Sequence, residues 1–145
     1  HFYQPPTQSH AVLKKVCRES YRPLIKVFKE HPESRVTVNM CGVLTEMLSN
    51  HGHGDIVEGL AGLGQNSQIE FTDSAKFHAI LPLIPEKEAR RQIELNRKTN
   101  LSFFKERLTL SAAFSYWAKV LSKTKLCLLW RTKSCIFSTI KEIAP

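Results

Sequence analysis

The sequence predicts an α/β fold in which βαβ units build a parallel sheet. Two short segments of β-favouring residues, 35–40 and 68–72, alternate with longer segments whose apolar residues recur every three or four positions. Strands separated by helices in this way form right-handed crossover units. The chain has 145 residues, which is enough for one domain with a sizeable core. A complete (β/α) barrel needs roughly 200 to 250 residues, so the chain can supply only part of one.

The first helix is expected to begin near Ser9 and to end before Pro32. Its apolar residues form one stripe, which consists of Val12, Leu13, Val16, Tyr21, Leu24, Ile25 and Phe28. Pro23 falls inside this stripe, and a proline lacks an N–H and clashes with the preceding helical turn. We therefore expect Pro23 either to kink the helix or to open a second helix as a first-turn residue.

The middle of the chain is expected to form a strand followed by two short helices. Residues 35–40 are rich in β-branched side chains, whereas residues 42–50 have helical spacing. Residues 50–54 contain two glycines and form a turn. Asp55 then caps the next helix, with Glu58 in the capping-box position three residues later.

The last elements are a strand and a longer helix. Gly64 is expected to stop the preceding helix, and the second strand follows at residues 68–72. The final helix runs from Pro85 to about Phe104. Its first turn carries acidic residues, which the helix dipole favours.

The net charge of +8 does not indicate a nucleic-acid partner, because it is unevenly distributed. Residues 1–104 hold 13 Lys and Arg against 11 Asp and Glu, whereas residues 105–145 hold 8 against 2. On a folded surface that binds nucleic acid, basic residues would alternate with residues that form the helices, strands and turns. The longest apolar stretches are also far shorter than the roughly 20 residues of a membrane helix. We therefore expect neither a nucleic acid nor a membrane as partner.

Neither the cysteines nor the histidines indicate a metal centre. The four cysteines, Cys17, Cys41, Cys127 and Cys135, form no Cys-x-x-Cys pair, and they fit thiols in a reducing compartment. We expect a cytoplasmic protein without a cofactor. His51, His53 and Asp55 could ligate a metal, but no further ligand is suggested, and we favour a glycine turn at this point.

The most informative segment of the chain is residues 67–85. It contains a short strand that carries Glu70 and, after a loop, His78, followed by an exit fixed by two prolines. A carboxylate at a strand end that faces a loop histidine is how an α/β barrel builds a polar pocket. A second motif, His-Phe-Tyr-Gln-Pro-Pro, occupies residues 1–6.

Together these two motifs resemble the first two sequence regions of glycoside hydrolase family 57, whose members act mostly on α-glucans. The resemblance covers residues 1–104, and it extends to residues 91–96 (Arg-Gln-Ile-Glu-Leu-Asn). It implies the first βαβ units of a distorted, TIM-like (β/α) barrel. The residues that it assigns to substrate binding are His1, Gln4, Glu70 and His78. Their carboxylate, amide and imidazole groups can match the hydroxyls of a sugar.

The chain departs from the family pattern at four positions near these motifs. Tyr3 stands where many members have a second histidine, and Ser67 replaces the usual glycine. Ala79 replaces a common proline, and Lys76 is unusual beside a sugar pocket. These departures weaken the inference of the substrate more than they weaken the inference of the fold.

Residues 105–145 form a compositionally atypical basic tail. Retaining glycosidases need two carboxyl groups that flank the scissile bond. Where the family supplies its nucleophilic glutamate, residues 112–118 read Ala-Ala-Phe-Ser-Tyr-Trp-Ala, and residues 107–141 contain no Asp or Glu. Translation in a shifted reading frame after about Lys105 would explain this change. A divergent but native amphipathic segment is the alternative.

These observations lead to two main functional hypotheses. In the first, the parent enzyme hydrolyses or transfers α-glucans by a retaining mechanism, and this chain is an inactive fragment with no assignable catalytic residue. A fragment is also suggested by the start at His1, without a methionine and inside a motif. In the second, the chain is a non-catalytic carbohydrate-binding remnant. A basic interaction module built on the tail ranks third. The expected partner is an α-glucan or an oligosaccharide.

Overall fold

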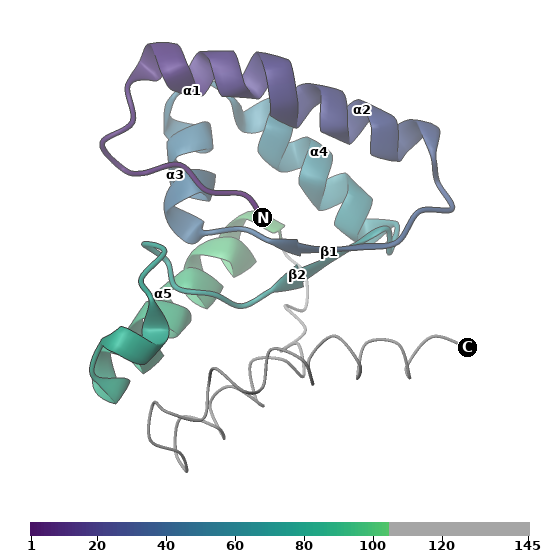
Figure 1. Ribbon diagram of the computed structural model, residues 1–145. Helices are drawn as coiled ribbons and strands as arrows, with labels where there is room; N and C mark the ends of the chain where they lie inside the picture. Colours follow the sequence, from purple (N-terminus) through teal and green to yellow (C-terminus); the bar gives the residue numbers. More distant parts are fainter. Residues whose placement is uncertain (105–145) are drawn as a thin grey trace, which may run out of the picture. The chain divides into compact units, whose positions relative to one another are not determined.

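The computed structural model describes residues 1–104, so the predictions for the tail and for the missing nucleophile lie outside the described residues (Figure 1). The elements follow one another in this order: α1 (His10–Val16), η1 (Cys17–Tyr21), α2 (Arg22–Glu30), β1 (Val36–Asn39), α3 (Gly42–Asn50), α4 (Gly54–Gln65), β2 (Ile69–Thr72), η2 (Leu81–Leu83) and α5 (Glu86–Phe104). No helix among these residues has both the length and the apolar character needed to cross a membrane.

The two predicted strands are present, and they pair in parallel as expected. Val36 lies opposite Ile69, and the register continues to Asn39 opposite Thr72. On the other edge of β1, Phe2 forms a parallel bridge with Met40. Its N–H donates to the Asn39 carbonyl at 2.7 Å. Three parallel segments therefore lie side by side in chain order, which confirms the predicted α/β arrangement.

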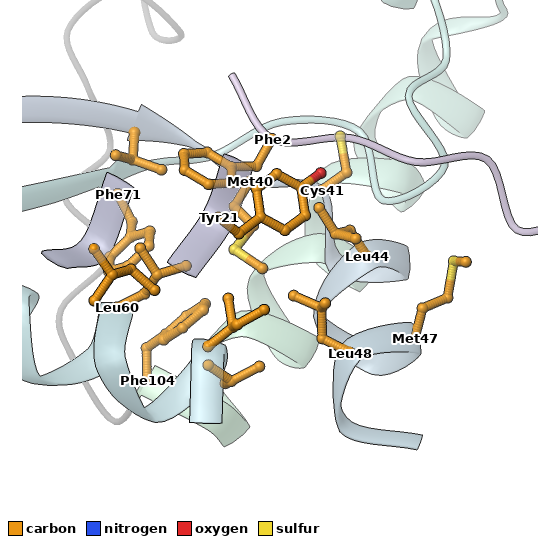
Figure 2. Packing of buried hydrophobic residues seen from close by; sticks show 14 of the residues in the cluster. Phe2, Tyr21, Met40, Cys41, Leu44, Met47, Leu48, Leu60, Phe71 and Phe104 are labelled. Atoms are coloured by element: carbon orange, nitrogen blue, oxygen red, sulfur yellow. The ribbon is translucent and has the colours of Figure 1, made fainter. Parts of the chain in front are cut away.

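The hydrophobic core lies between the sheet and the helices. Figure 1 shows α1, α2 and α4 on one side of the paired strands. Phe2 and Tyr21 pack with ring centroids 5.1 Å apart, and Phe71 stacks on Phe104 at 4.4 Å (Figure 2). Leucines from three helices complete the core, and Leu13, Leu44, Leu48 and Leu60 are fully buried. Burial of such side chains is the main favourable contribution to folding.

The first helical segment begins as predicted and is modified where Pro23 enters it. The Ser9 hydroxyl accepts a hydrogen bond from the Val12 N–H and so caps α1. A short π-helical stretch, η1, then joins α1 to α2. The Arg22 N–H bonds to the Cys17 carbonyl, five residues back, and Pro23 lies in the first turn of α2. The wider π turn comes directly before the residue that lacks an N–H, and π turns are a known way for a helix to accommodate such an interruption.

The predicted capping role of Asp55 is wrong. The helix α4 begins one residue earlier, at Gly54, and His53 precedes it without a side-chain capping bond. The Asp55 carboxylate instead accepts two hydrogen bonds from the Arg22 guanidinium, at 2.6 and 2.8 Å. This bidentate ion pair holds the pKa of Asp55 below its ordinary value. It joins α2 to α4, and this pairing replaces the local capping box.

The backbone at the end of α4 shows what one departure from the family pattern, Ser67, does to the fold. The helix continues one residue past Gly64, to Gln65, and Ser67 adopts a left-handed conformation with φ of 59°. The Ser67 N–H donates to the Gly64 carbonyl at 2.8 Å. A residue with a Cβ is disfavoured in this conformation, whereas glycine is not. The usual glycine of the family therefore fits this backbone better than serine does.

Replacing Ser67 with glycine should raise the free energy of unfolding by roughly 0.5 to 1 kcal/mol, because the strain of the left-handed conformation exceeds the added entropy of the unfolded chain. Thermal unfolding of the whole chain, followed by circular dichroism, measures the change. Ser49→Gly is the matched control, since Ser49 is exposed inside α3, and it should be destabilising. Equal losses for the two variants would contradict the prediction.

Candidate functional site

The candidate site lies on the face of the sheet opposite the helices. Successive side chains of a strand point to opposite faces. Val38 and Phe71 are accordingly buried against the helices. The intervening positions are polar and exposed or half-buried: Thr37 and Asn39 on β1, and Glu70 and Thr72 on β2. We call this polar surface the open face.

A chain of hydrogen bonds crosses the open face at the carboxyl ends of the strands. His1 Nδ1 donates to Asn39 Oδ1 at 2.8 Å, and Asn39 Nδ2 donates to Thr72 Oγ1 at 3.2 Å. The three residues come from the three parallel segments. In (β/α) barrels this end of the sheet carries the active site. Asn39 and Thr72 were missed from sequence, although their two-residue spacing from Thr37 and Glu70 places them on the same face.

Three rings form a cluster beside this chain of hydrogen bonds. The imidazole of His78 stacks on the ring of Tyr3 with centroids 4.2 Å apart and an interplanar angle of 16°. His1 lies 4.8 Å from His78, centroid to centroid. The structure therefore brings together two of the predicted site residues, His1 and His78. Tyr3, a departure from the family pattern, supplies the surface against which His78 rests.

Glu70 shares the open face but does not touch the ring cluster. It lies on β2 opposite Thr37 of β1 and two residues before Thr72, a spacing of about 7 Å along a strand. Its side chain is exposed, and it has no hydrogen bond or ion pair with any residue of the described range. The carboxylate is therefore free to accept hydrogen bonds from a ligand that lies over the sheet.

Gln4 is the predicted site residue that the structure places elsewhere. Its Nε2 donates to the Tyr21 hydroxyl at 3.4 Å, and this contact is partly buried. Burial raises the pKa of Tyr21, while the bond from Gln4 opposes that rise. Among residues 1–104, Gln4 has no bond to His1, Glu70 or His78. Its contact links the first motif to the helical layer.

Lys76 is held by an ion pair behind the site. Its Nζ lies 2.7 Å from Glu46 Oε1 on α3, and only 13% of the lysine side chain is exposed. The Lys76 carbonyl also accepts from the Val43 N–H at the start of α3. Its side chain therefore anchors the loop after β2 to α3, which gives this unusual residue a structural role.

Asp73 is a buried carboxyl group close to the carboxyl end of β2. It follows β2 directly, is 5% exposed, and neither of its oxygens has a partner among residues 1–104. Burial raises its pKa, and the nearby charge of Arg97 on α5 opposes that rise. Asp73 is thus buried beside the helices, whereas Glu70 points to the open face.

The helix α5 presents a row of buried polar side chains to the loops that follow the strands. The row consists of Gln92, Asn96, Thr99 and Asn100. Asn100 Nδ2 donates to the Met40 carbonyl, and its Oδ1 accepts from the Thr45 hydroxyl, both at 2.9 Å. Asn96 Oδ1 accepts from the Gly42 N–H. A Cβ on Gly42 would lie 3.1 Å from that oxygen, so glycine permits this close approach.

A turn is present at His51 and Gly52, within the predicted range 50–54, and α4 begins at Gly54. Gly52 has a φ of 77°, which suits glycine. His53 Nδ1 lies 3.3 Å from the Arg22 guanidinium, and burial together with that cation lowers the pKa of His53. In residues 1–104, no three His, Cys, Asp or Glu side chains are grouped so that they could hold a metal ion.

Parallel segments joined by helices, with polar side chains gathered at their carboxyl ends, are the architecture of part of a (β/α) barrel. Residues 2–112 match the model of glycosyl hydrolase family 57, and the chain belongs to this family. This confirms the resemblance inferred from residues 1–6 and 67–85.

Relatives with established names agree with this assignment. The chain is 33% identical to alpha-amylase 1 of Dictyoglomus thermophilum over 94 residues, which are 65% of this chain and 14% of that protein. It is 28% identical to the 4-alpha-glucanotransferase of Thermococcus litoralis over 95 residues, which are 66% of this chain and 14% of that protein. The chain thus spans about one-seventh of the length of these relatives.

A solved structure supports the predicted fold. The crystal structure of the 4-alpha-glucanotransferase from Thermococcus litoralis superposes with a TM-score of 0.64 at 26% sequence identity. The match covers 75% of this chain and 16% of that protein. Together with the parallel pairing of β1 and β2, this agrees with the first units of a partial (β/α) barrel.

Proposed function

We propose that this chain carries part of an α-glucan-binding subsite, on the open face, of an enzyme that hydrolyses or transfers α-glucans with retention of configuration. The observation that carries the proposal is the convergence of His1, Tyr3 and His78 with Asn39 and Thr72 where the parallel segments end. The names of the relatives, alpha-amylase and 4-alpha-glucanotransferase, supply the substrate class.

The chemistry of the open face suits a sugar. Ring faces of aromatic residues pack against the apolar faces of sugar rings, and the polar groups beside them can bond to hydroxyls. Tyr3 and His78 provide such a ring pair, and Glu70 supplies a carboxylate with free acceptor positions on the same face. Gln4, which bonds to Tyr21, is assigned a supporting role in this proposal.

We further propose that the chain does not catalyse the reaction by itself. A retaining mechanism needs two carboxyl groups about 5 to 5.5 Å apart on either side of the scissile bond. Glu70 and Asp73 are close in sequence, but Glu70 is exposed on the open face whereas Asp73 is buried beside α5. They therefore do not face one substrate together. Residues 107–141 contribute no carboxylate at all.

This lack of an assignable carboxylate pair also favours the second candidate, a non-catalytic carbohydrate-binding remnant. The two candidates share the binding surface and differ in the origin of catalysis. In the first, catalytic groups come from the rest of a longer enzyme. In the second, binding is the whole function of the chain.

Binding without turnover is the expected result for the purified chain. Isothermal titration calorimetry with maltoheptaose should detect weak, saturable binding, and a reducing-sugar assay with soluble starch should give no rate above background. Glu70→Gln and His78→Ala should each weaken binding by roughly three- to tenfold, since each removes about one hydrogen bond or ring contact.

Two matched controls make this experiment specific. Glu58→Gln removes an exposed carboxylate on α4, and His31→Ala removes an exposed histidine beyond α2. Neither should change the affinity. Absence of any binding would refute the subsite. Starch hydrolysis at enzymatic rates that Glu70→Gln abolished would refute the proposed inactivity and the binding role of Glu70.

A further inference from the structure

The loop that carries His78 adopts a conformation that must be held in place by its surroundings. His78 has a φ of 57°, in the left-handed region that residues with a Cβ disfavour. Its side chain is exposed, and its N–H bonds to the Ala75 carbonyl within the same short turn. The local turn alone leaves the orientation of the loop relative to the sheet undetermined.

The two residues before His78 are both anchored on Gln92 of α5. Gln92 Oε1 accepts a hydrogen bond from the Phe77 N–H at 3.2 Å. The backbone carbonyl of Gln92 accepts from the Lys76 N–H at 3.1 Å. Gln92 Nε2 donates to Glu88 Oε1 at 2.9 Å, and this bond directs the amide so that its oxygen faces the loop.

Gln92 is placed behind the site and not within it. Its side chain is 8% exposed, and its contacts are to the backbone of the loop and to its own helix. A ligand on the open face would meet the imidazole of His78 and the ring of Tyr3, which stack at 4.2 Å. Gln92 thus holds the loop from the side of α5, and the His78 ring on this loop rests on Tyr3.

We propose that Gln92 is a positioning residue, which fixes the His78 imidazole against Tyr3 by holding the backbone of residues 76–77. The proposal rests on the proposed function in so far as the positioned imidazole binds an α-glucan. The side-chain amide fixes the loop through one acceptor oxygen. Loss of that oxygen frees the Phe77 N–H and allows the ring to leave the stack.

Two variants separate the acceptor from the volume of the side chain. Gln92→Met keeps the length of the side chain and removes the acceptor, whereas the double variant Glu88→Gln/Gln92→Glu keeps an acceptor oxygen at position 92 and an amide-to-carboxylate bond between the two side chains. In proton NMR spectra of the full chain, stacking on Tyr3 should move the His78 ring protons upfield. Tyr3→Ala gives the reference for an unstacked ring. Gln92→Met should lose most of the upfield shift, and the double variant Glu88→Gln/Gln92→Glu should retain it.

The affinity for maltoheptaose should follow the ring position. Gln92→Met should bind about three- to tenfold more weakly than the unmodified chain, and the double variant Glu88→Gln/Gln92→Glu should retain most of the binding. The control is Gln65→Met, at an exposed glutamine at the end of α4, which should change neither the ring shift nor the affinity. Unchanged ring protons in a folded Gln92→Met variant would overturn the proposal.

Hydrogen exchange in the unmodified chain tests the proposal without any variant. The Phe77 side chain is 46% exposed, so the bond to Gln92 is the reason to expect a protected Phe77 amide. Exchange at the rate of an unstructured peptide would overturn the positioning role even if Gln92→Met failed to fold. If the chain bound no glucan but the ring shift and the protection were as expected, the proposed function would fail while the positioning role of Gln92 stood.

Discussion

Replacing Asn100 with alanine should lower the free energy of unfolding by about 3 to 4 kcal/mol, the largest loss expected for a polar residue in residues 1–104. The side chain is fully buried, and it bonds both to the Met40 carbonyl and to the Thr45 hydroxyl. Its removal leaves two buried polar groups without partners, at roughly 1 to 3 kcal/mol each. It also leaves a small cavity.

The Asn100 contacts join three elements, so the loss should affect the whole fold. Met40 directly follows β1 and bridges to Phe2, Thr45 lies on α3, and Asn100 itself lies on α5. Urea unfolding at constant pH, followed by circular dichroism, measures the change. Asn50→Ala is the control, because Asn50 is exposed at the end of α3, and it should change stability by less than about 0.5 kcal/mol. A similarly small effect of Asn100→Ala would contradict the prediction.

Replacing Asp73 with asparagine should raise the free energy of unfolding at pH 7 by about 1 to 2 kcal/mol. Asp73 is 5% exposed, and both of its carboxylate oxygens are buried without a partner in the part of the chain that the structure describes. A buried group that cannot be hydrogen-bonded costs of the order of 1 to 3 kcal/mol, and more when it is charged. Asparagine has the same shape and carries no charge.

The pH dependence of this effect follows from the raised pKa of Asp73. Between the ordinary pKa of 3.8 and the raised value, the folded chain keeps a proton that the unfolded chain has released. The unfolded state therefore binds fewer protons, and stability falls as the pH rises through this window. Asp73→Asn has no such carboxyl group, so its free energy of unfolding does not fall in this window. Its advantage should be small near pH 4 and should grow toward pH 7.

Denaturant unfolding of both proteins between pH 4 and pH 7 checks this trend. Glu58→Gln removes a carboxylate that is exposed on α4, and it should produce no growing advantage. Destabilisation by Asp73→Asn at pH 7 would contradict the prediction, and it would mean that the carboxylate is ionised and stabilised by a positive charge such as that of Arg97.

The two variants test two kinds of buried polar side chain, one with hydrogen-bond partners and one without. Asn100 belongs to the α5 row, and both its Oδ1 and its Nδ2 have a partner. Asp73, which directly follows β2, has no partner for either carboxylate oxygen within residues 1–104, and Asn96 Nδ2 also lacks one there. Fully satisfied buried networks stabilise a fold, whereas partly satisfied ones cost stability. The opposite signs expected for the two substitutions follow from this difference.

The sequence alone determined the order and type of the elements and the parallel sheet. Apolar periodicity located α4, Pro85 and the acidic first turn after it located α5, and β-favouring residues located β1 and β2 to within one or two positions. These features depend on local preferences and on the side-chain period of each element, which one sequence contains. Two short motifs were also enough to indicate the family and to select His1 and His78, which the fold brings together.

The tertiary structure alone decided which groups pair across the fold. Asp55 was expected to cap its own helix, but Arg22, which is 33 residues away, offers a bidentate partner that a local capping bond does not match. Gln4 bonds to Tyr21, and Asp73 is buried while Glu70 is exposed. The physical reason is common to all three: hydrogen bonds and burial depend on which surfaces pack together, and that packing is a property of the folded chain.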